Sequence, residues 1–470
     1  MPTLNDILIL LPEFYLVAAA CLLLLLDAFM KPAQRPLLHW ISIAVLLVAI
    51  YLVIAGQPDR AVTAFGSMFV RDDVAEIIKV FALGTTAMIF VYARPYLIDR
   101  KLLGGEFYTL MIFAVIGIML LVSAGNLVTV YLGLELLSLS SYALVALNRE
   151  AKLPSEAAIK YFVLGALASG MGGTPTLELA QLSHVMGYTT APTLLLFGLI
   201  FMIVGIGFKL GAAPFHMWIP DVYQGAPTPV TTFVAAGSKL AAFGMAYRLL
   251  ADGMGDLAQH WQLILAVLAV LSLAIGNLVA IVQTNLKRML AYSTISHMGY
   301  LLLGLSAAGP EGYAAALFYA ICYALMGVAA FGVILAMSRA GFECEEIADF
   351  KGLARKAPWM AFLMLLAMFS LAGVPPLFGF WAKVLVLEAA IHADMLWLAI
   401  VGIVFAIVGL YYYLYVIKVM YFDAPEEGGA LQLQQDKPLR LVLSLNALSL
   451  LVLGLYWGPL LAWCRRAFGL

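Results

Sequence analysis

Three lysines and one glutamate lie deep inside apolar runs of the sequence. Lys239 and Glu135 are each near the centre of a run of about one membrane crossing, and Lys209 and Lys383 lie in longer apolar stretches. A charged side chain at the centre of a bilayer costs about 3 kcal/mol even on the lenient insertion scale. These four residues are therefore the first candidates for function.

The chemistry that such residues support is proton transfer. Burial favours the neutral form of an amine, and a nearby carboxylate favours its charged form, so moving the carboxylate drives proton uptake or release. This mechanism needs no redox cofactor. His297 would extend a proton path, because Ser293 and His297 share one helical face, as do Ser296 and Tyr300. The spacing predicts a polar stripe along that helix.

Prolines interrupt the two longest apolar stretches close to their lysines. The stretches 193–219 and 359–391 are both too long for one straight crossing. Proline removes a backbone donor and clashes with the preceding turn, which predicts helix breaks at Gly211–Pro214 and Gly373–Pro376. Unwound backbone is tolerated within a membrane only where it lines a cavity or is buried in protein. Two such helices indicate the inverted repeats that ion transporters use.

Structural explanations compete with the functional ones. The buried lysines and glutamate can be ion-pair partners that only hold helices together. Lys160 follows Glu156 by four residues, so a local pair near the membrane surface competes with a role in a proton path. His297 fits a packed histidine equally well, and His216, beside the first break, fits a structural role. Lys79 is expected to snorkel to the membrane surface.

The composition is that of a membrane protein. Hydrophobic residues make up 64% of the 470 residues and charged residues 11%, too few to cover a soluble core of this size. Recurring apolar runs predict an all-α integral membrane fold of about fourteen transmembrane helices. The net charge of −1 argues against nucleic acid as a partner. The four cysteines show no disulfide, metal, iron–sulfur or haem spacing.

The predicted crossings follow one another with short loops, and the first has no basic flank or cleavage site, so it is expected to be retained. They are 7–29, 37–55, 74–93, 107–124, 126–147, 157–172, 192–213, 228–250, 262–282, 290–307, 312–338, 359–391, 395–421 and 438–463. They divide into three N-terminal helices (1–105), a first repeat (106–255), a second repeat (256–422), and a linker with the last helix (423–470).

The distribution of basic residues predicts the orientation. With the N-terminus outside, the inner loops hold most of the lysines and arginines that lie in loops. The outer side holds only Arg60, Arg71, Arg248, Arg465 and Arg466. The positive-inside rule then places both termini on the outer side of a bacterial inner membrane.

Five segments carry a family resemblance that extends over essentially the whole chain. They are YLGLELLSL (131–139), EAAIKYFVLGA (156–166), KLGAAPFHMWIPDVYQGAPTPV (209–230), YSTISHMGY (292–300) and GVPPLFGFWAK (373–383). The chain resembles the antiporter-like membrane subunits of proton-pumping NADH:quinone oxidoreductase, respiratory complex I. Within these subunits, the chain most resembles the subunit N (subunit 2) family. The features that carry this resemblance are the lysine at 383, the sequences around Glu156 and Tyr292, and an end soon after the last helix.

The resemblance implies roles for individual residues. Glu135 and Lys209 would form the coupled ion pair, Lys239 would bridge, Lys383 would lie near the exit path, and Lys160 would be accessory. It also implies that this chain binds no cofactor or metal. NADH, flavin, iron–sulfur clusters and quinone would belong to the complex, and the partners would be other membrane subunits, including paralogues, and the lipid bilayer.

The sixth crossing departs from the family, and other functions stay open. After Gly170 and Met171 this chain passes to Gly172-Gly173-Thr174-Pro175, about a dozen residues short of a normal span. A short helix with an unwound outer end is expected there. The alternatives are a subunit of a multisubunit cation/proton antiporter or membrane hydrogenase, and a structural membrane subunit that does not pump.

Overall fold

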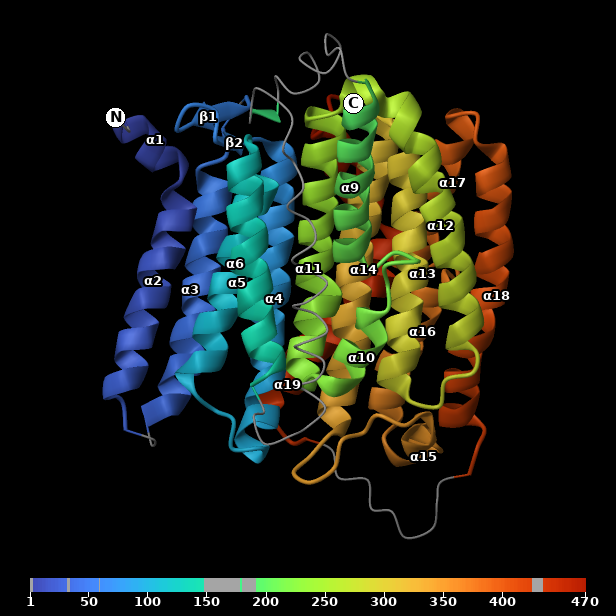
Figure 1. Cartoon of the computed structure of the whole chain (residues 1–470). Coiled ribbons are helices and arrows are strands. Elements are labelled where there is room, and N and C mark those ends of the chain that lie inside the picture. Colours follow the sequence, from blue (N-terminus) through green and yellow to red (C-terminus); the bar gives the residue numbers. More distant parts are fainter. Residues whose placement is uncertain (1–2, 32–33, 59, 148–177, 180–191, 425–433) are drawn as a thin grey trace.

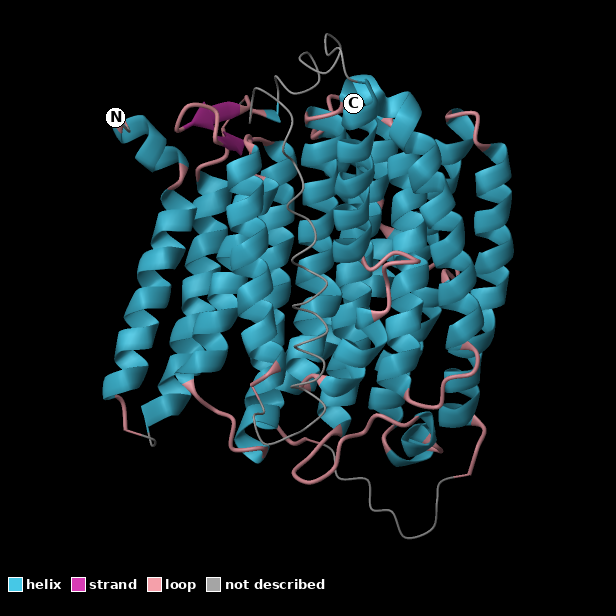
Figure 2. Cartoon of the chain, in the orientation of Figure 1, coloured by secondary structure: helices cyan, strands magenta, loops and turns pink. Residues whose placement is uncertain are grey.

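The computed structural model describes residues 3–31, 34–58, 60–147, 178–179, 192–424 and 434–470. This part of the chain is mostly helical, and its helices lie side by side in one bundle (Figure 1). One antiparallel hairpin, β1 (Val62–Ala64) with β2 (Phe69–Arg71), lies at the end of the bundle near the N-terminus (Figure 2). Apolar runs form helices because a bilayer offers no partners for backbone polar groups.

Within the described ranges, nine helices are long and apolar enough to cross a membrane. The elements are α1 (Leu4–Ile9), α2 (Leu11–Phe29), α3 (Arg35–Ala55), α4 (Asp73–Asp99), α5 (Gly105–Val122), α6 (Leu127–Val145), α9 (Pro192–Leu210), α10 (Trp218–Gly225), α11 (Thr228–Tyr247), η3 (Arg248–Asp252), η4 (Gly255–Leu257), α12 (Ala258–Ala280), α13 (Leu286–Ser306), α14 (Gly309–Met337), η5 (Ile347–Phe350), α15 (Leu353–Lys356), α16 (Pro358–Ala372), α17 (Phe378–His392), α18 (Leu396–Tyr421), α19 (Lys437–Leu455) and α20 (Gly458–Arg466). The predicted fold class, a helical membrane bundle with broken helices, is confirmed.

The core of the bundle is centred on α11 and α14. Their side chains are buried along nearly their whole length. In contrast, α2 and α3 at one edge and α18 at the other expose rows of leucine, isoleucine and valine (Figure 1). Since polar side chains are sparse on these faces, they suit lipid or other membrane helices as neighbours.

The predicted helix breaks are both present, and a third was missed. The break between α9 and α10 lies at mid-height of the bundle (Figure 2), and that between α16 and α17 begins at Gly373. The run 438–463 was predicted as one crossing, but it forms α19 and α20. Pro459, in the first turn of α20, lacks an N–H and starts a helix more readily than it continues one. The prediction of a single helix there is wrong.

Lys79 does not snorkel. Its side chain is 1% exposed and its Nζ lies 2.9 Å from Glu13 Oε1 and 3.3 Å from Glu76 Oε1. Arg71 binds the same Glu76 carboxylate at 3.2 Å. Because α2 and α4 both turn a carboxylate inward, the amine has buried partners that are nearer than the membrane surface. The snorkelling prediction is therefore wrong.

Some predictions lie outside the described residues. These are Glu156 and Lys160, the short sixth crossing with its unwound end, and with them the total of about fourteen helices. The division of the chain into four segments also stays a prediction.

Candidate functional site

The first helix break frees backbone groups in the middle of the bundle. Gly211 ends α9 with a φ of +76°, a left-handed conformation that a side chain disfavours. The amide of Ala212 donates to Gly207 O at 2.8 Å, which closes the last turn. The carbonyls and amides that follow have no partner in their own helix.

Side chains of neighbouring helices satisfy these freed groups. Lys239 Nζ, from α11, donates to Leu210 O at 2.8 Å, and Trp218 Nε1 donates to Phe208 O at 3.0 Å. Ser272 Oγ, from α12, accepts from the amide of Ala213 at 2.9 Å. The backbone at this break therefore faces protein, as predicted.

The second break repeats the first in detail. Gly373 ends α16 with a φ of +83°, and the amide of Val374 donates to Phe369 O across the same five-residue separation. Lys383 Nζ, from α17, donates to Ala372 O at 2.7 Å. Ser370 Oγ accepts from the amide of Gly379 at 3.1 Å. Each broken helix thus ends on a buried lysine amine.

An aromatic ring faces each of these two amines. The Lys239 amine lies 4.8 Å from the centre of the Trp218 ring, and the Lys383 amine lies 5.1 Å from that of Tyr300. The carbonyl end of a helix and the face of an aromatic ring both carry partial negative charge. Both breaks can therefore hold a cation without a full carboxylate.

Lys209 lies in the last turn of α9 and connects the first break to α6. Its Nζ donates to Ser138 Oγ at 2.9 Å, and its side chain is 3% exposed. Glu135, half-buried and almost one turn before Ser138, attracts Lys209 electrostatically, whereas Lys239 and Lys209 repel each other. The structure therefore brings together three of the four residues singled out first in the sequence.

His297 is the centre of a second polar group, which we call the His297 cluster. Its Nδ1 is 2.6 Å from Tyr319 Oη, and its Nε2 is 3.1 Å from Tyr413 Oη, which is 2.5 Å from Ser293 Oγ. The cluster comprises Ser293, Thr294, His297, Tyr319, Tyr323 and Tyr413, with Thr294 Oγ1 2.6 Å from Tyr323 Oη. Lys383 is close enough to act electrostatically on His297.

The predicted polar stripe on α13 is only partly realised. Ser293 and His297 meet at Tyr413, but Ser296 and Tyr300 bond elsewhere. Ser296 Oγ accepts from Asn277 Nδ2 at 2.9 Å, and Tyr300 Oη donates to Gly402 O at 2.8 Å. A shared helical face does not give shared partners, because α12, α14, α17 and α18 all pack against α13.

His216 lies in the loop between α9 and α10 and is half-buried. Its backbone carbonyl accepts from the amide of Ile219 at 2.9 Å, so the residue helps to start α10. The role of its side chain stays a prediction.

Sequence reasoning missed the tyrosines of the His297 cluster. Tyr319 and Tyr323 come from α14 and Tyr413 from α18, all within continuous apolar runs. A tyrosine in such a run has no spacing that marks it as polar, since its hydroxyl is placed only by packing. The one available signal is that Tyr319 and Tyr323 are four residues apart, and therefore on one helical face.

Two interrupted helices, each with a buried lysine amine at its interruption, define an antiporter-like membrane subunit. The chain matches the family described as NADH:quinone oxidoreductase/Mrp antiporter, TM, over residues 124–409. It is 53% identical to NADH-quinone oxidoreductase subunit N of Xanthomonas euvesicatoria pv. vesicatoria (strain 85-10), with 99% of this chain and 97% of that protein aligned. The chain belongs to this family, and within it to the subunits N of NADH-quinone oxidoreductase.

Two solved structures resemble the fold. A chain of respiratory complex I from Thermus thermophilus with bound aureothin has a TM-score of 0.81 at 32% identity, covering 96% of this chain and 98% of that one. A chain of the Mrp complex from Dietzia sp. DQ12-45-1b has a TM-score of 0.85 at 21% identity, covering 99% and 97%, and shows the fold alone. The chain is thus a multi-pass inner-membrane subunit whose partners are the other membrane subunits of complex I.

Proposed function

We propose that this chain carries protons across the membrane along Glu135, Lys209, Lys239, the His297 cluster and Lys383. The observation that supports the path best is the pair of buried lysine amines at the two helix breaks. Protons would be exchanged between neighbouring amines, hydroxyls and imidazole, and no bond other than those to hydrogen would change. Lys160 and His216 would be accessory residues.

The driving force would come from changes in electrostatic coupling. A carboxylate nearby stabilises a buried ammonium, and a second ammonium nearby destabilises it. Movement of Glu135 away from Lys209 would therefore favour transfer of the Lys209 proton, while a charge on Lys209 would drive a proton from Lys239 toward the second half. The alternation of attraction and repulsion along one line gives the transfer a direction.

Redox chemistry would take place in other subunits of the complex. The family name refers to NADH and quinone, and this chain would supply only the proton path. Flavin, iron–sulfur clusters and quinone would be bound elsewhere. Conformational change in the neighbouring membrane subunits would transmit the energy of NADH oxidation to Glu135 and Lys209.

The orientation that we propose follows from the basic loops. Arg94, Arg100, Lys287, Arg339 and Lys356 lie at the end of the bundle that carries α15. The described chain begins and ends at the opposite end (Figure 1). With the basic end in the cytoplasm, both termini lie on the outer side and protons move from the α15 end outward.

The test of the proposed function compares Lys209→Ala and Glu135→Ala with an exposed control in the assembled complex. Both variants are expected to assemble and to lose most NADH-driven pumping, because each removes half of a coupled pair. Asp256→Asn, in η4 and away from the path, should behave like the unchanged protein. Full pumping and full quinone reduction in both variants would rule out the path.

A further inference from the structure

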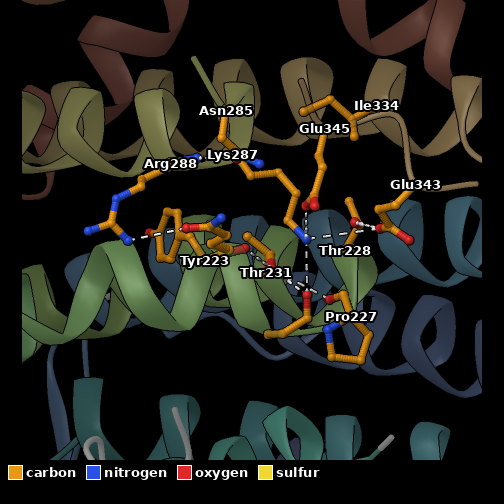
Figure 3. A network of polar contacts seen from close by, with 12 residues as sticks. Tyr223, Pro227, Thr228, Thr231, Asn285, Lys287, Arg288, Ile334, Glu343 and Glu345 are labelled. Carbon is orange, nitrogen blue, oxygen red and sulfur yellow. Dashed lines mark hydrogen bonds and ion pairs between the residues drawn. The ribbon is translucent and has the colours of Figure 1, made fainter. Parts of the chain in front are cut away.

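A cluster of charged residues, drawn from close by in Figure 3, joins the loop after α14 to α4, α11 and α13. Glu343 and Glu345 come from the loop after α14, and Lys287 comes from the first turn of α13. Lys287 Nζ lies 3.9 Å from Glu343 Oε1 and 3.6 Å from Glu345 Oε2. The lysine side chain is 2% exposed, whereas those of the two glutamates are 25% and 29% exposed. The cluster therefore reaches from the aqueous surface into the core.

The Glu343 carboxylate contacts four side chains, one of which is that of Lys287. The carboxylate accepts from Tyr96 Oη, on α4, at 3.2 Å and from Arg100 Nη2, just after the end of α4, at 2.5 Å. It also accepts from Thr228 Oγ1 at the start of α11. The helix α11 supplies only the Thr228 hydroxyl. The charged or titratable groups around this carboxylate come from α4 and its end, from α13, and from the loop after α14. These groups are Tyr96, Arg100, Lys287, Cys344 and Glu345.

Lys287 connects this surface to the interior. Its Nζ donates to Ala226 O, at the end of α10, at 3.2 Å. The same carbonyl accepts from Thr231 Oγ1 at 3.4 Å, and Thr231 Oγ1 also donates to Tyr223 O at 3.1 Å. In Figure 3, Thr231 and Tyr223 lie between Lys287 and Arg288.

Beyond these two backbone carbonyls, polar side chains lead to the His297 cluster. Tyr223 is buried, and its side chain interacts with that of Tyr323, a member of the cluster. Tyr323 lies against the imidazole of His297, with the two ring centres 5.0 Å apart. Lys287 and His297 are ten residues apart on α13, which corresponds to a rise of about 15 Å. Tyr223 and Tyr323 thus lie between the Lys287 end of α13 and His297.

We propose that Glu343 and Glu345 collect protons from the cytoplasmic side and pass them through Lys287 to the His297 cluster. This inference rests on the proposed function and supplies the uptake branch of its path. A proton from water binds a carboxylate oxygen. Lys287 gives a proton to water beside Ala226 O, from which it moves on toward the Tyr223 and Tyr323 hydroxyls. The amine then takes the proton held by the carboxylate, which becomes ionised again. Partly exposed carboxylates suit the first step, since water reaches them.

The test uses the complex in inside-out membrane vesicles, where the medium sets the pH of the cytoplasmic face. Glu343→Gln together with Glu345→Gln is expected to lower pumping about threefold near pH 8.5 and little near pH 6.5, because capture limits the rate only when protons are scarce. Asp221→Asn is the matched control. Its carboxylate is 35% exposed, pairs with the neighbouring Arg288 at 3.1 Å, and lies off the route.

Lys287→Arg separates a relay from a purely structural charge. Arginine keeps the positive charge but does not release its proton in proteins, so pumping should fall at every pH. Normal pumping by this variant would overturn the relay. Rates are divided by the amount of assembled complex. If the double variant does not assemble, Glu345→Gln alone leaves the Glu343 contacts in place and should show the same alkaline loss.

Lys209→Ala in parallel separates the two proposals. If it abolishes pumping while the double glutamate variant keeps the pH profile of the unchanged protein, the uptake route is wrong and the proposed function stands. If Lys209→Ala pumps normally, the proposed function fails, and the uptake route fails with it.

Discussion

At the scale of single residues, the lysines at the helix breaks are bound in a way that suits exchange. Lys239 and Lys383 each donate to a backbone carbonyl. A carbonyl accepts a hydrogen bond from a charged ammonium or from a neutral amine, so the contact survives loss of the proton. A carboxylate in the same place would hold the amine charged. The observed partners therefore favour groups that pass protons on.

Removal of one hydroxyl tests the His297 cluster. Tyr413→Phe deletes the group that contacts both His297 Nε2 and Ser293 Oγ. Pumping is expected to fall about a hundredfold, the lower end of the usual range for a proton-transfer group, with normal assembly. Tyr92→Phe is the matched control, because Tyr92 is equally buried but lies on α4 beside Asn446. Equal rates for the two variants would exclude Tyr413 from the path.

The buried ionic group near the N-terminus has a different expected role. Lys79→Met removes the only cation that contacts both Glu13 and Glu76 in the described structure. A buried charge left without its partner costs about 3–5 kcal/mol. The melting temperature of the purified complex and its yield should therefore drop. Lys418→Met, which removes an exposed pair with Asp423, should change neither, since exposed pairs contribute about 1 kcal/mol or less. Equal stability of both variants would contradict a structural role for Lys79.

Single residues were predictable from the sequence when their charge conflicted with their surroundings. Lys209, Lys239, Lys383 and Glu135 stand out because each interrupts an apolar run. Tyr319 and Tyr413 do not, because tyrosine is common in such runs and only packing decides where its hydroxyl lies. The pairing of Lys79 was not predictable either, since its partner Glu13 is on another helix.

At the scale of elements, the backbone at each break and the lysine beside it form one unit. At Gly373 the φ is +83°, and an added Cβ would lie 2.8 Å from Lys383 Cδ. A side chain there would therefore strain the backbone and also displace the amine from Ala372 O.

Gly373→Ala is accordingly expected to reduce pumping more than it reduces assembly. The control is Gly341→Ala, which has a similar φ of +73° but nothing within 4 Å of the added Cβ. Left-handed strain alone costs about 1–2 kcal/mol, so both variants should lose some stability. Only Gly373→Ala should lose transport. Equal transport in the two variants would show that the lysine position does not depend on the break.

Element boundaries were predictable where proline and glycine occur together. The breaks after Leu210 and Ala372 follow from Gly211 with Pro214 and from Gly373 with Pro376. The break at Pro459 also has a glycine and a proline together. It was missed because the apolar run 438–463 is short enough for one straight crossing, so its length did not indicate a break. The hairpin β1–β2 has only three residues in each strand, too few for a reliable alternating pattern.

At the scale of the whole molecule, polar groups from elements far apart in the sequence meet inside an otherwise apolar bundle. Lys209 of α9 contacts Ser138 of α6, and His297 of α13 contacts Tyr319 of α14 and Tyr413 of α18. The apolar outer faces of α2, α3 and α18 leave the bundle open to lipid and to neighbouring subunits (Figure 1). A path of this kind passes between elements far apart in sequence, so its course could not be predicted before the helices were placed.

The orientation of the molecule gives the last prediction. Asp394, in the exposed turn between α17 and α18, and Arg355, exposed on α15, lie at opposite ends of the bundle (Figure 1). In a background without the four native cysteines, Asp394→Cys is expected to react with a membrane-impermeant maleimide in intact spheroplasts. Arg355→Cys should react only in inside-out vesicles, because the basic loops are retained in the cytoplasm.

The two cysteine variants are controls for each other. In each preparation, spheroplasts or inside-out vesicles, one cysteine should react with the maleimide and the other should not. Reaction of both from one side would contradict the crossing of α16 and α17 between them. A complete reversal would leave the fold intact but place the Glu343 and Glu345 carboxylates on the outer face. Protons would then be released rather than collected there, and the uptake route through Lys287 would be wrong.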